Sequence, residues 1–219
     1  MKANLETSLQ FTAHWEGGYQ CLRADAGNWT GGRCGKGMLV GSCRGISAPV
    51  LSAYLGRPAL PAEMSCLSEA TFADIAERHY WRVLCCDALP TGVDLLQFDF
   101  GFNAGAKTAV RVLQDVLGVK ADGAMGKKTL AAVQSFQDIH GSLLQGYKSR
   151  LALELKSGHG DGHWKALATL CAALASAQES HYRHLPAFKT FGQGWITRTE
   201  ARLDAALDLL RQAGAGASA

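Results

Sequence analysis

The sequence predicts a predominantly α-helical fold with one small β-hairpin. Of the 219 residues, 47% are hydrophobic and 19% are charged, which is typical of an ordinary globular protein. Apolar residues recur at helical spacing along most of the chain. Residues 20–47 lack this spacing and are rich in glycine, so we expect a loop that contains the hairpin. The length suits one large domain or two small ones.

The first predicted helix ends at a carboxylate. Leu5, Leu9 and Glu16 share one helical face, and the pair Gly17-Gly18 is a natural stop. A carboxyl group at the inward end of a helix is partly removed from water, which favours its protonated form. A general acid that works near neutral pH requires this property. The alternative is a solvated glutamate at a frayed helix end.

The remaining helices are predicted from apolar spacing and from residues that begin or end a helix. Ser68 is a suitable N-cap, and Gly118 is a suitable stop. The predicted ranges are 68–80, 93–102, 107–117, 127–136, 139–156, 164–182 and 195–212.

The net charge of +3 is unevenly distributed. Residues 1–103 hold 8 Lys and Arg against 10 Asp and Glu, a balance of −2, whereas residues 104–219 hold 14 against 9, a balance of +5. A basic second half suits an anionic polymer such as cell-wall glycan, nucleic acid or a lipid surface, although an ordinary solvated surface has the same charge. We expect no membrane span and no signal peptide, because no apolar run is long enough.

The chain has seven cysteines, an odd number, so at least one thiol is unpaired within the monomer. No Cys or His spacing typical of zinc is present, and we expect neither a metal nor a cofactor. Cys34 and Cys43 flank the glycine-rich loop and would suit a disulfide in an oxidising compartment. Buried free thiols are the alternative.

Glu16 has a potential partner in Asp25, nine residues further on. Two carboxylates that flank a cleft are the minimal equipment for glycoside cleavage. One protonates the leaving oxygen, and the other activates water or stabilises the oxocarbenium ion. The nearby rings of Trp15, Tyr19 and Trp29 suit stacking on sugars.

Two weaker constellations are present. The segment 157–164 reads Ser-Gly-His-Gly-Asp-Gly-His-Trp, which offers metal-ligand types without a helical spacing to preorganise them. Cys21 with His14 or His79 would suit nucleophilic catalysis, but no oxyanion motif follows. A solvated loop and a packed thiol are the simpler interpretations.

An ordered set of short motifs extends along nearly the whole chain. Glu16-Gly17-Gly18-Tyr19, Asp25-x-Gly27 and Gly45-Ile46-Ser47 occur in this order. This order resembles the glycoside hydrolase family 108 muramidases, which read E-G-G-Y, D-P-G-G-A-T and Y-G-I-T. Further similar motifs are His79-Tyr80-Trp81, Phe98-Asp99 with Asn103-Ala104-Gly105, Leu113-Gln114, Asp122-Gly123-x-x-Gly126, and Phe191–Trp195 followed by Arg198.

The resemblance implies a lysozyme-like α+β fold and hydrolysis of the β-1,4 bond from N-acetylmuramic acid to N-acetylglucosamine in peptidoglycan. Glu16 would be the general acid. Residues 1–105 would form the catalytic region, and residues 106–219 a helical, peptidoglycan-binding-like region packed on it. Peptidoglycan glycan strands would be the binding partner, with no role for nucleic acid.

The water-activating group implied by the resemblance is Asp25 with a hydroxyl partner. Family members pass quickly from the Asp to a Thr, whereas this chain has extra residues 28–43 there, so Ser42 takes the place of that Thr. Ser47 is the alternative hydroxyl. This arrangement favours inversion at the anomeric carbon, although the separation of the carboxyl groups decides the outcome. A second insertion covers residues 158–181.

Substrate contacts are expected from Tyr19, Trp29 and Ser47. Asp99 and Asn103 lie four residues apart on one helical face and would either line the sugar groove or cap and bridge helices.

Two other activities fit the same residues. A lytic transglycosylase would use the same Glu and leave a 1,6-anhydro end, and a non-catalytic module would only bind peptidoglycan. Without a signal peptide, delivery to the wall would require either a phage holin or a specialised secretion system, the latter with an immunity protein as a further partner. We expect a monomer that is made in the cytoplasm and acts in the periplasm or on the cell wall.

Overall fold

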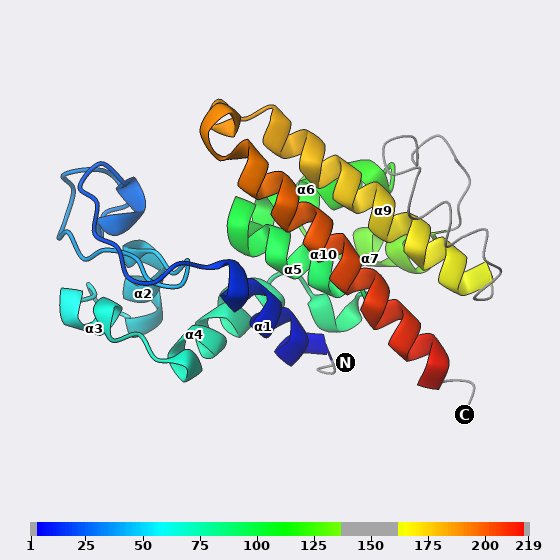
Figure 1. Cartoon of the computed structure of the whole chain (residues 1–219), viewed down its shortest axis with the longest axis horizontal. Helices are drawn as coiled ribbons and strands as arrows, with labels where there is room; N and C mark the ends of the chain where they lie inside the picture. The colour runs from blue at the N-terminus through cyan, green and yellow to red at the C-terminus, as the bar shows by residue number, and fades with distance from the viewer. Residues whose placement is uncertain (1–3, 137–161, 217–219) are drawn as a thin grey trace. The chain divides into compact units, whose positions relative to one another are not determined.

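The computed structural model describes residues 4–136 and 162–216, and these residues are mainly helical (Figure 1). No described helix is long and apolar enough to cross a membrane. The helices are α1 (Leu5–Trp15), α2 (Ala48–Leu55), α3 (Pro61–Ser65), α4 (Glu69–Ala76), α5 (Val93–Ala104), α6 (Ala106–Val116), α7 (Lys127–Gln134), α9 (Gly162–Arg183) and α10 (Phe188–Gly216), with short 3-10 or π turns η2 (Ala26–Asn28), η3 (Glu77–Trp81) and η4 (Cys86–Ala88).

The chain forms two compact units. One consists of Leu9–Tyr80, and the other of Met1–Ser8 with Trp81–Ala219. The predicted division after Gly105 does not coincide with the boundary of these units, because α5 packs against α6, α9 and α10. The assignment of catalysis to residues 1–105 concerns function and stays a prediction.

Most predicted helices are present, with shifted ends. The helix expected over 68–80 is divided into α4 and the π-helical turn η3. The last helix begins at Phe188, earlier than expected, and it includes Gly192 and Gly194. Helices α2 and α3 were not predicted, and the helix expected over 139–156 lies outside the described residues.

The expected hairpin in residues 20–47 is not confirmed. In this segment the structure has only isolated antiparallel bridges, which join Gln20 to Ser42, Trp29 to Leu39 and Cys43 to Ile46. The physical reason is the backbone conformation of the glycines, because positive φ angles interrupt extended strands. The interrupting positions are Gly32, Gly35, Gly37, Gly41 and Gly45.

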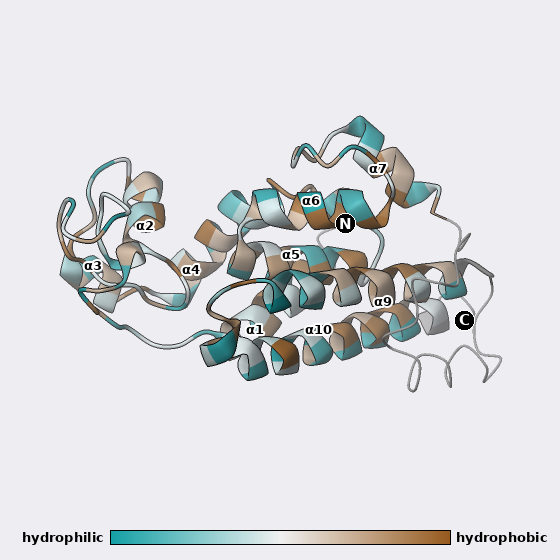
Figure 2. Cartoon of the chain, turned by 90° about the horizontal axis from the view of Figure 1, so that it is seen from above, coloured by the Kyte–Doolittle hydropathy of each residue, from teal (hydrophilic) through white to brown (hydrophobic). Residues whose placement is uncertain are grey.

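The core of the second unit is built around α5. All residues of α5 from Val93 to Phe102 are buried, including polar ones, so this helix is covered on every side. Figure 2 shows α9 and α10 side by side, and both contact α5. Gly101 permits the close packing, since a Cβ there would lie 2.6 Å from Cδ1 of Leu84.

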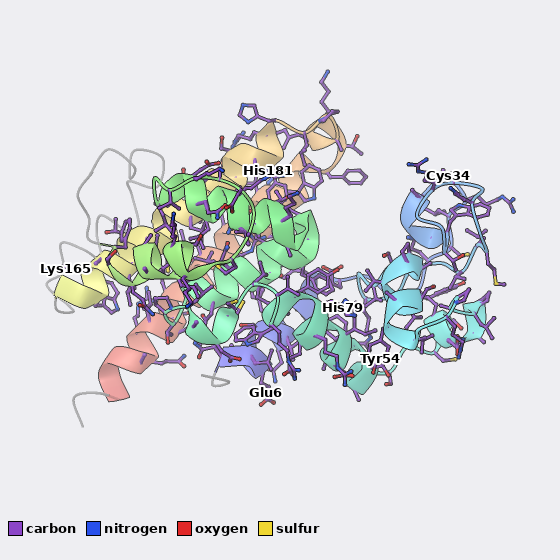
Figure 3. The ribbon with its side chains drawn as sticks, turned by 180° about the vertical axis from the view of Figure 1, so that it is seen from behind. Glu6, Cys34, Tyr54, His79, Lys165 and His181 are labelled. Atoms are coloured by element: carbon purple, nitrogen blue, oxygen red, sulfur yellow. The ribbon has the colours of Figure 1, made fainter. Side chains whose placement is uncertain are left out.

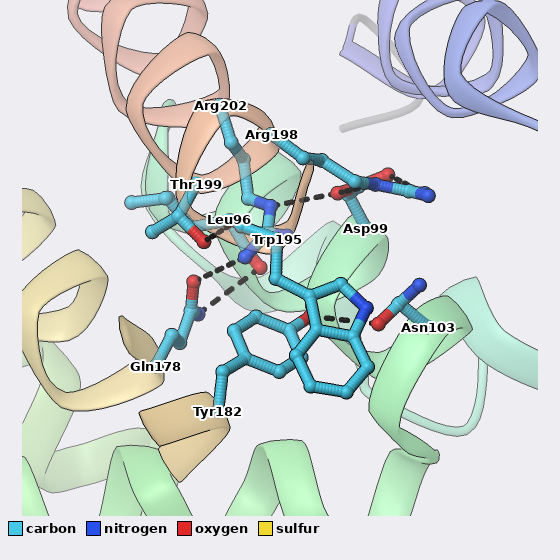
Figure 4. Close-up of polar contacts among 9 residues, drawn as sticks. All are labelled: Leu96, Asp99, Asn103, Gln178, Tyr182, Trp195, Arg198, Thr199 and Arg202. Atoms are coloured by element: carbon cyan, nitrogen blue, oxygen red, sulfur yellow. Dashed lines mark hydrogen bonds and ion pairs between the residues drawn. The ribbon is translucent and has the colours of Figure 1, made fainter. Parts of the chain in front are cut away.

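A buried ion cluster links α5 to α10 (Figure 4). The carboxylate of Asp99 accepts hydrogen bonds from Arg198 at 2.7 and 3.1 Å and from Nε of Arg202 at 2.7 Å. The side chains of Asp99 and Arg202 are 0% exposed. A substrate therefore cannot reach Asp99 in this structure, which agrees with the helix-bridging interpretation and not with the expected sugar contact.

Helix α9 joins the same cluster. Nη1 of Arg202 donates to Oε1 of Gln178 at 2.6 Å, and Nε2 of Gln178 donates to the carbonyl of Leu96 at 3.3 Å. The exposed Asn103 accepts a hydrogen bond from the hydroxyl of Tyr182 at 2.8 Å, so its side chain also joins α5 to α9. These polar contacts tie three helices together (Figure 4).

Removing the carboxylate should greatly destabilise the second unit. Asp99→Ala leaves two buried guanidinium groups without their counterion, and we expect a loss of about 3–5 kcal/mol in the free energy of unfolding. Urea denaturation measures this loss. Asp208→Ala, which breaks only a surface ion pair with Arg211, is the control and should cost less than about 1 kcal/mol. Equal losses in the two variants would contradict the assigned role of Asp99.

Candidate active site

The loop after α1 pairs with the segment that precedes α2. Gln20 and Ser42 exchange two backbone hydrogen bonds of 2.9 and 2.8 Å. The amide of Arg44 donates to the carbonyl of Gly17 at 3.0 Å, which brings the residue after Glu16 beside this segment. Gly41 is required here because its φ is +92° and a Cβ would lie 2.6 Å from the carbonyl oxygen of Gln20.

The side-chain amide of Gln20 gathers two of the predicted catalytic residues. Its nitrogen Nε2 lies 2.6 Å from Oγ of Ser42 and 3.0 Å from Oδ2 of Asp25. Oδ1 of Asn28 is a third acceptor at 3.0 Å. Since the amide has two hydrogens, the three acceptors share them. Asp25 and Ser42, which the sequence predicts as a carboxylate with its hydroxyl partner, therefore lie around one atom.

Asp25 is exposed, yet its orientation is fixed by two donors. Oδ1 accepts from the amide of Gly27 at 2.8 Å, and Oδ2 accepts from Gln20. The first of these bonds caps η2, a role that aspartate performs well. Ser47, the alternative hydroxyl, lies beside the same turn, because a Cβ on Gly27 would lie 3.5 Å from the Cβ of Ser47.

Asn28 supports this arrangement from the interior. It is 0% exposed, and its Nδ2 donates to Oε1 of Gln20 at 2.8 Å and to the carbonyl of Leu22 at 2.9 Å. Its own carbonyl accepts from the amides of Val40 and Gly41. Sequence reasoning missed Gln20 and Asn28, since their contacts arise from the pairing with Ser42 and not from a local spacing.

Glu16 is half-buried and follows the last residue of α1. Burial and, after it, the negative charge of Glu16 raise the pKa of the Tyr80 phenol above its ordinary value. Tyr80 belongs to the π-helical turn η3, and such turns are frequent at functional sites. The phenol of Tyr80 therefore remains neutral near the Glu16 carboxyl group.

The two aromatic residues predicted to contact sugar differ in accessibility. Tyr19 is 42% exposed, and its hydroxyl donates to the carbonyl of Val40 at 3.1 Å. Trp29 is buried, and its indole nitrogen donates to the carbonyl of Arg23 at 2.9 Å. Trp29 thus supports the loop from within, whereas the ring of Tyr19 is available to a ligand.

The weaker candidates gain no support from the described residues. These residues contain no group of three His, Cys, Asp or Glu that could hold a metal ion. His159 and Asp161 lie outside the described residues. All seven cysteines are free, including Cys34 and Cys43.

Comparisons with known proteins agree with the predicted resemblance. Residues 9–105 match the family model of glycosyl hydrolase 108. The structure of SagA from Brucella abortus is similar to this chain, with a TM-score of 0.72 and 29% sequence identity. The similarity covers 96% of this chain and 98% of SagA. None of the curated proteins matches the sequence.

Titration of Tyr80 tests its proximity to Glu16 without any assumption about activity. Glu16→Gln removes a negative charge, so the pKa of Tyr80 should fall and its phenolate should form at lower pH. The Tyr80 signal is the difference in phenolate absorbance between each protein and its Tyr80→Phe counterpart. Glu69→Gln, in the same unit, is the control and should leave the pKa unchanged. A Tyr80 titration that Glu16→Gln does not move would refute the assigned proximity.

Proposed function

We propose that this chain, whose residues 9–105 belong to glycosyl hydrolase family 108, is an N-acetylmuramidase. In this proposal it hydrolyses the β-1,4 bond from N-acetylmuramic acid to N-acetylglucosamine in peptidoglycan. The observation that carries the proposal is the Gln20 amide, which holds the Asp25 carboxylate and the Ser42 hydroxyl together. A carboxylate beside a hydroxyl is suited to bind and activate one water molecule.

Glu16 is the general acid of the proposed reaction. Its half-buried carboxyl group follows the end of α1, and the nearby Tyr80 phenol adds no charge. The proton passes to the glycosidic oxygen as the bond from that oxygen to the anomeric carbon breaks. The leaving sugar departs as a neutral alcohol.

Asp25 and Ser42 supply the nucleophile. Each oxygen of Asp25 accepts one hydrogen bond and keeps acceptor capacity for a water proton. Oγ of Ser42 accepts from Gln20, so its own hydrogen is free to orient the water oxygen. Water adds to the anomeric carbon while its proton passes to Asp25. This general-base role makes the product an inverted α-anomer.

The Asp25–Ser42 pair favours hydrolysis over the two other activities. A lytic transglycosylase attacks with a hydroxyl of its own substrate and needs no residues that hold water. A module that only binds peptidoglycan needs no activated carboxylate. We further propose that the enzyme reaches the wall through a holin or a specialised secretion system.

Digestion of purified sacculi tests the reaction and its acid. Wild-type protein should release fragments with reducing N-acetylmuramic acid ends, identified by mass spectrometry. Glu16→Gln should abolish release because the amide cannot donate the proton to the leaving oxygen, and a melting curve checks that the variant is folded. Anhydro ends would indicate a transglycosylase. Equal release by wild type and Glu16→Gln would refute the assignment of the acid.

Gln20 tests the positioning of the water-binding pair. Gln20→Glu keeps the size of the side chain but removes the N–H donor to Asp25 and Ser42, so we expect kcat to fall by about 10²-fold with little change in KM. The pH profile should also change, because another carboxyl group then lies beside that of Asp25. Gln134→Ala, on an exposed face of α7, is the control. Unchanged kcat and pH profile in Gln20→Glu would count against this role.

A further inference from the structure

The extra residues that follow Asp25 fold into an ordered loop with a tight turn at its end. The amide of Thr30 donates to the carbonyl of Met38 at 2.9 Å, and the amide of Gly31 donates to the carbonyl of Lys36 at 3.0 Å. A bond of 3.0 Å from the amide of Lys36 to the carbonyl of Arg33 closes a β-turn. The two cationic residues therefore occupy the two ends of one turn.

Glycines define the conformation of this loop. Gly35 has a φ of +76° at the third position of the turn, where L-residues other than Asn are strained. A Cβ on Gly31 would lie 2.7 Å from the carbonyl oxygen of Lys36, and one on Gly37 would lie 2.3 Å from Oγ1 of Thr30. That hydroxyl accepts a hydrogen bond from the amide of Met38 at 2.9 Å. The sequence thus encodes one particular shape.

The turn packs against the segment that contains Asp25. The thiol of Cys34, labelled in Figure 3, donates to the carbonyl of Ala24 at 3.2 Å. On the same segment, the guanidinium carbon of Arg23 lies 5.5 Å from the ring centre of Trp29. Arg33 and Lys36 therefore lie on a turn that contacts the residue before Asp25, and Arg23 lies on that same segment. We call Arg23, Arg33 and Lys36 the cationic turn.

The charge balance of this region is strongly positive. Asp25 is the sole acidic residue between positions 17 and 62, against five Arg and Lys residues. Two of the five are paired, Arg44 with Glu69 and Arg57 with Glu63. The three members of the cationic turn are exposed and have no acidic partner in the described part of the chain. Three exposed cations without an acidic partner, on one turn and the segment that it contacts, are suited to bind anions.

We propose that the cationic turn binds carboxylate groups of the peptide stems of peptidoglycan next to the cleavage site. This inference rests on the proposed function. In peptidoglycan that carries stems, the lactyl carboxyl group of N-acetylmuramic acid forms the amide bond to the stem, so the sugars themselves offer no counterion. The peptide attached to the muramic acid ends in carboxylates, which arginine and lysine bind as ion pairs. The extra loop thereby makes the enzyme select glycan that carries stems over bare glycan.

Steady-state kinetics on two soluble substrates tests the proposal. One is a preparation of glycan chains with their peptide stems, and the other is the same chains after an amidase has removed the stems and the exposed lactyl carboxyl groups have been converted to neutral amides. Wild-type KM should be about 3- to 10-fold lower for the stem-bearing chains, the range expected for two or three exposed ion pairs. Arg33→Ala/Lys36→Ala should abolish this preference and leave the KM for bare chains unchanged. Added salt should weaken the wild-type preference.

Arg33→Lys/Lys36→Arg is the matched control, since it retains both charges and should retain the preference. A preference that survives Arg33→Ala/Lys36→Ala, or a wild type without any preference, would overturn the proposal. Calorimetric binding of the same two substrates to Glu16→Gln gives a readout that does not depend on turnover. If the protein binds stem-bearing chains selectively but does not hydrolyse them, the proposed muramidase activity is refuted and the proposed role of the cationic turn stands. If it hydrolyses both substrates without selectivity, the role of the cationic turn is refuted and the muramidase activity stands.

Discussion

The helical unit depends on the ion pairs that the buried carboxylate of Asp99 forms with two arginines. A charge with no exposure to water is tolerated only when counterions and hydrogen bonds replace the water. Arg198 and Arg202 provide both, and they come from α10, about one hundred residues further along the chain. The helix α5 can therefore be covered on every side although it carries a charge at its centre. The ion cluster joins α5 to α10, and the contact of Arg202 with Gln178 extends it to α9.

The polar groups of the glycine-rich loops also need hydrogen-bond partners, and here no helix supplies them. The positive φ angles of these loops prevent a β-ladder, so backbone and side-chain polar groups need other partners. Gln20 and Asn28 provide them, and the same bonds that satisfy the loop also orient Asp25 and Ser42. An amide is suited to this task, because its N–H group donates to the carboxylate and to the hydroxyl oxygen while its carbonyl accepts from Asn28. Stability and chemistry thus use one set of hydrogen bonds.

Local signals predicted the elements that local energetics control. Helices such as α6 and α7 have clear apolar spacing and stops, and their predicted ranges agree with the structure to within a few residues. The division of the predicted helix 68–80 was missed because a π turn depends on where Tyr80 and Trp81 pack, not on propensity. The hairpin is not confirmed, because the glycines that favour turns also adopt positive φ angles, which interrupt extended backbone.

The sequence by itself predicted the resemblance to glycosyl hydrolase family 108, the helical class and the candidates Glu16, Asp25 and Ser42, because these follow from residue types in a fixed order. Only the tertiary structure decided that Gln20 joins Asp25 to Ser42, that Tyr80 lies near Glu16, and that Asp99 is a buried counterion. The reason is physical. Order and spacing constrain neighbours along a helix or turn, whereas hydrogen bonds and ion pairs between distant segments depend on how the chain folds back on itself.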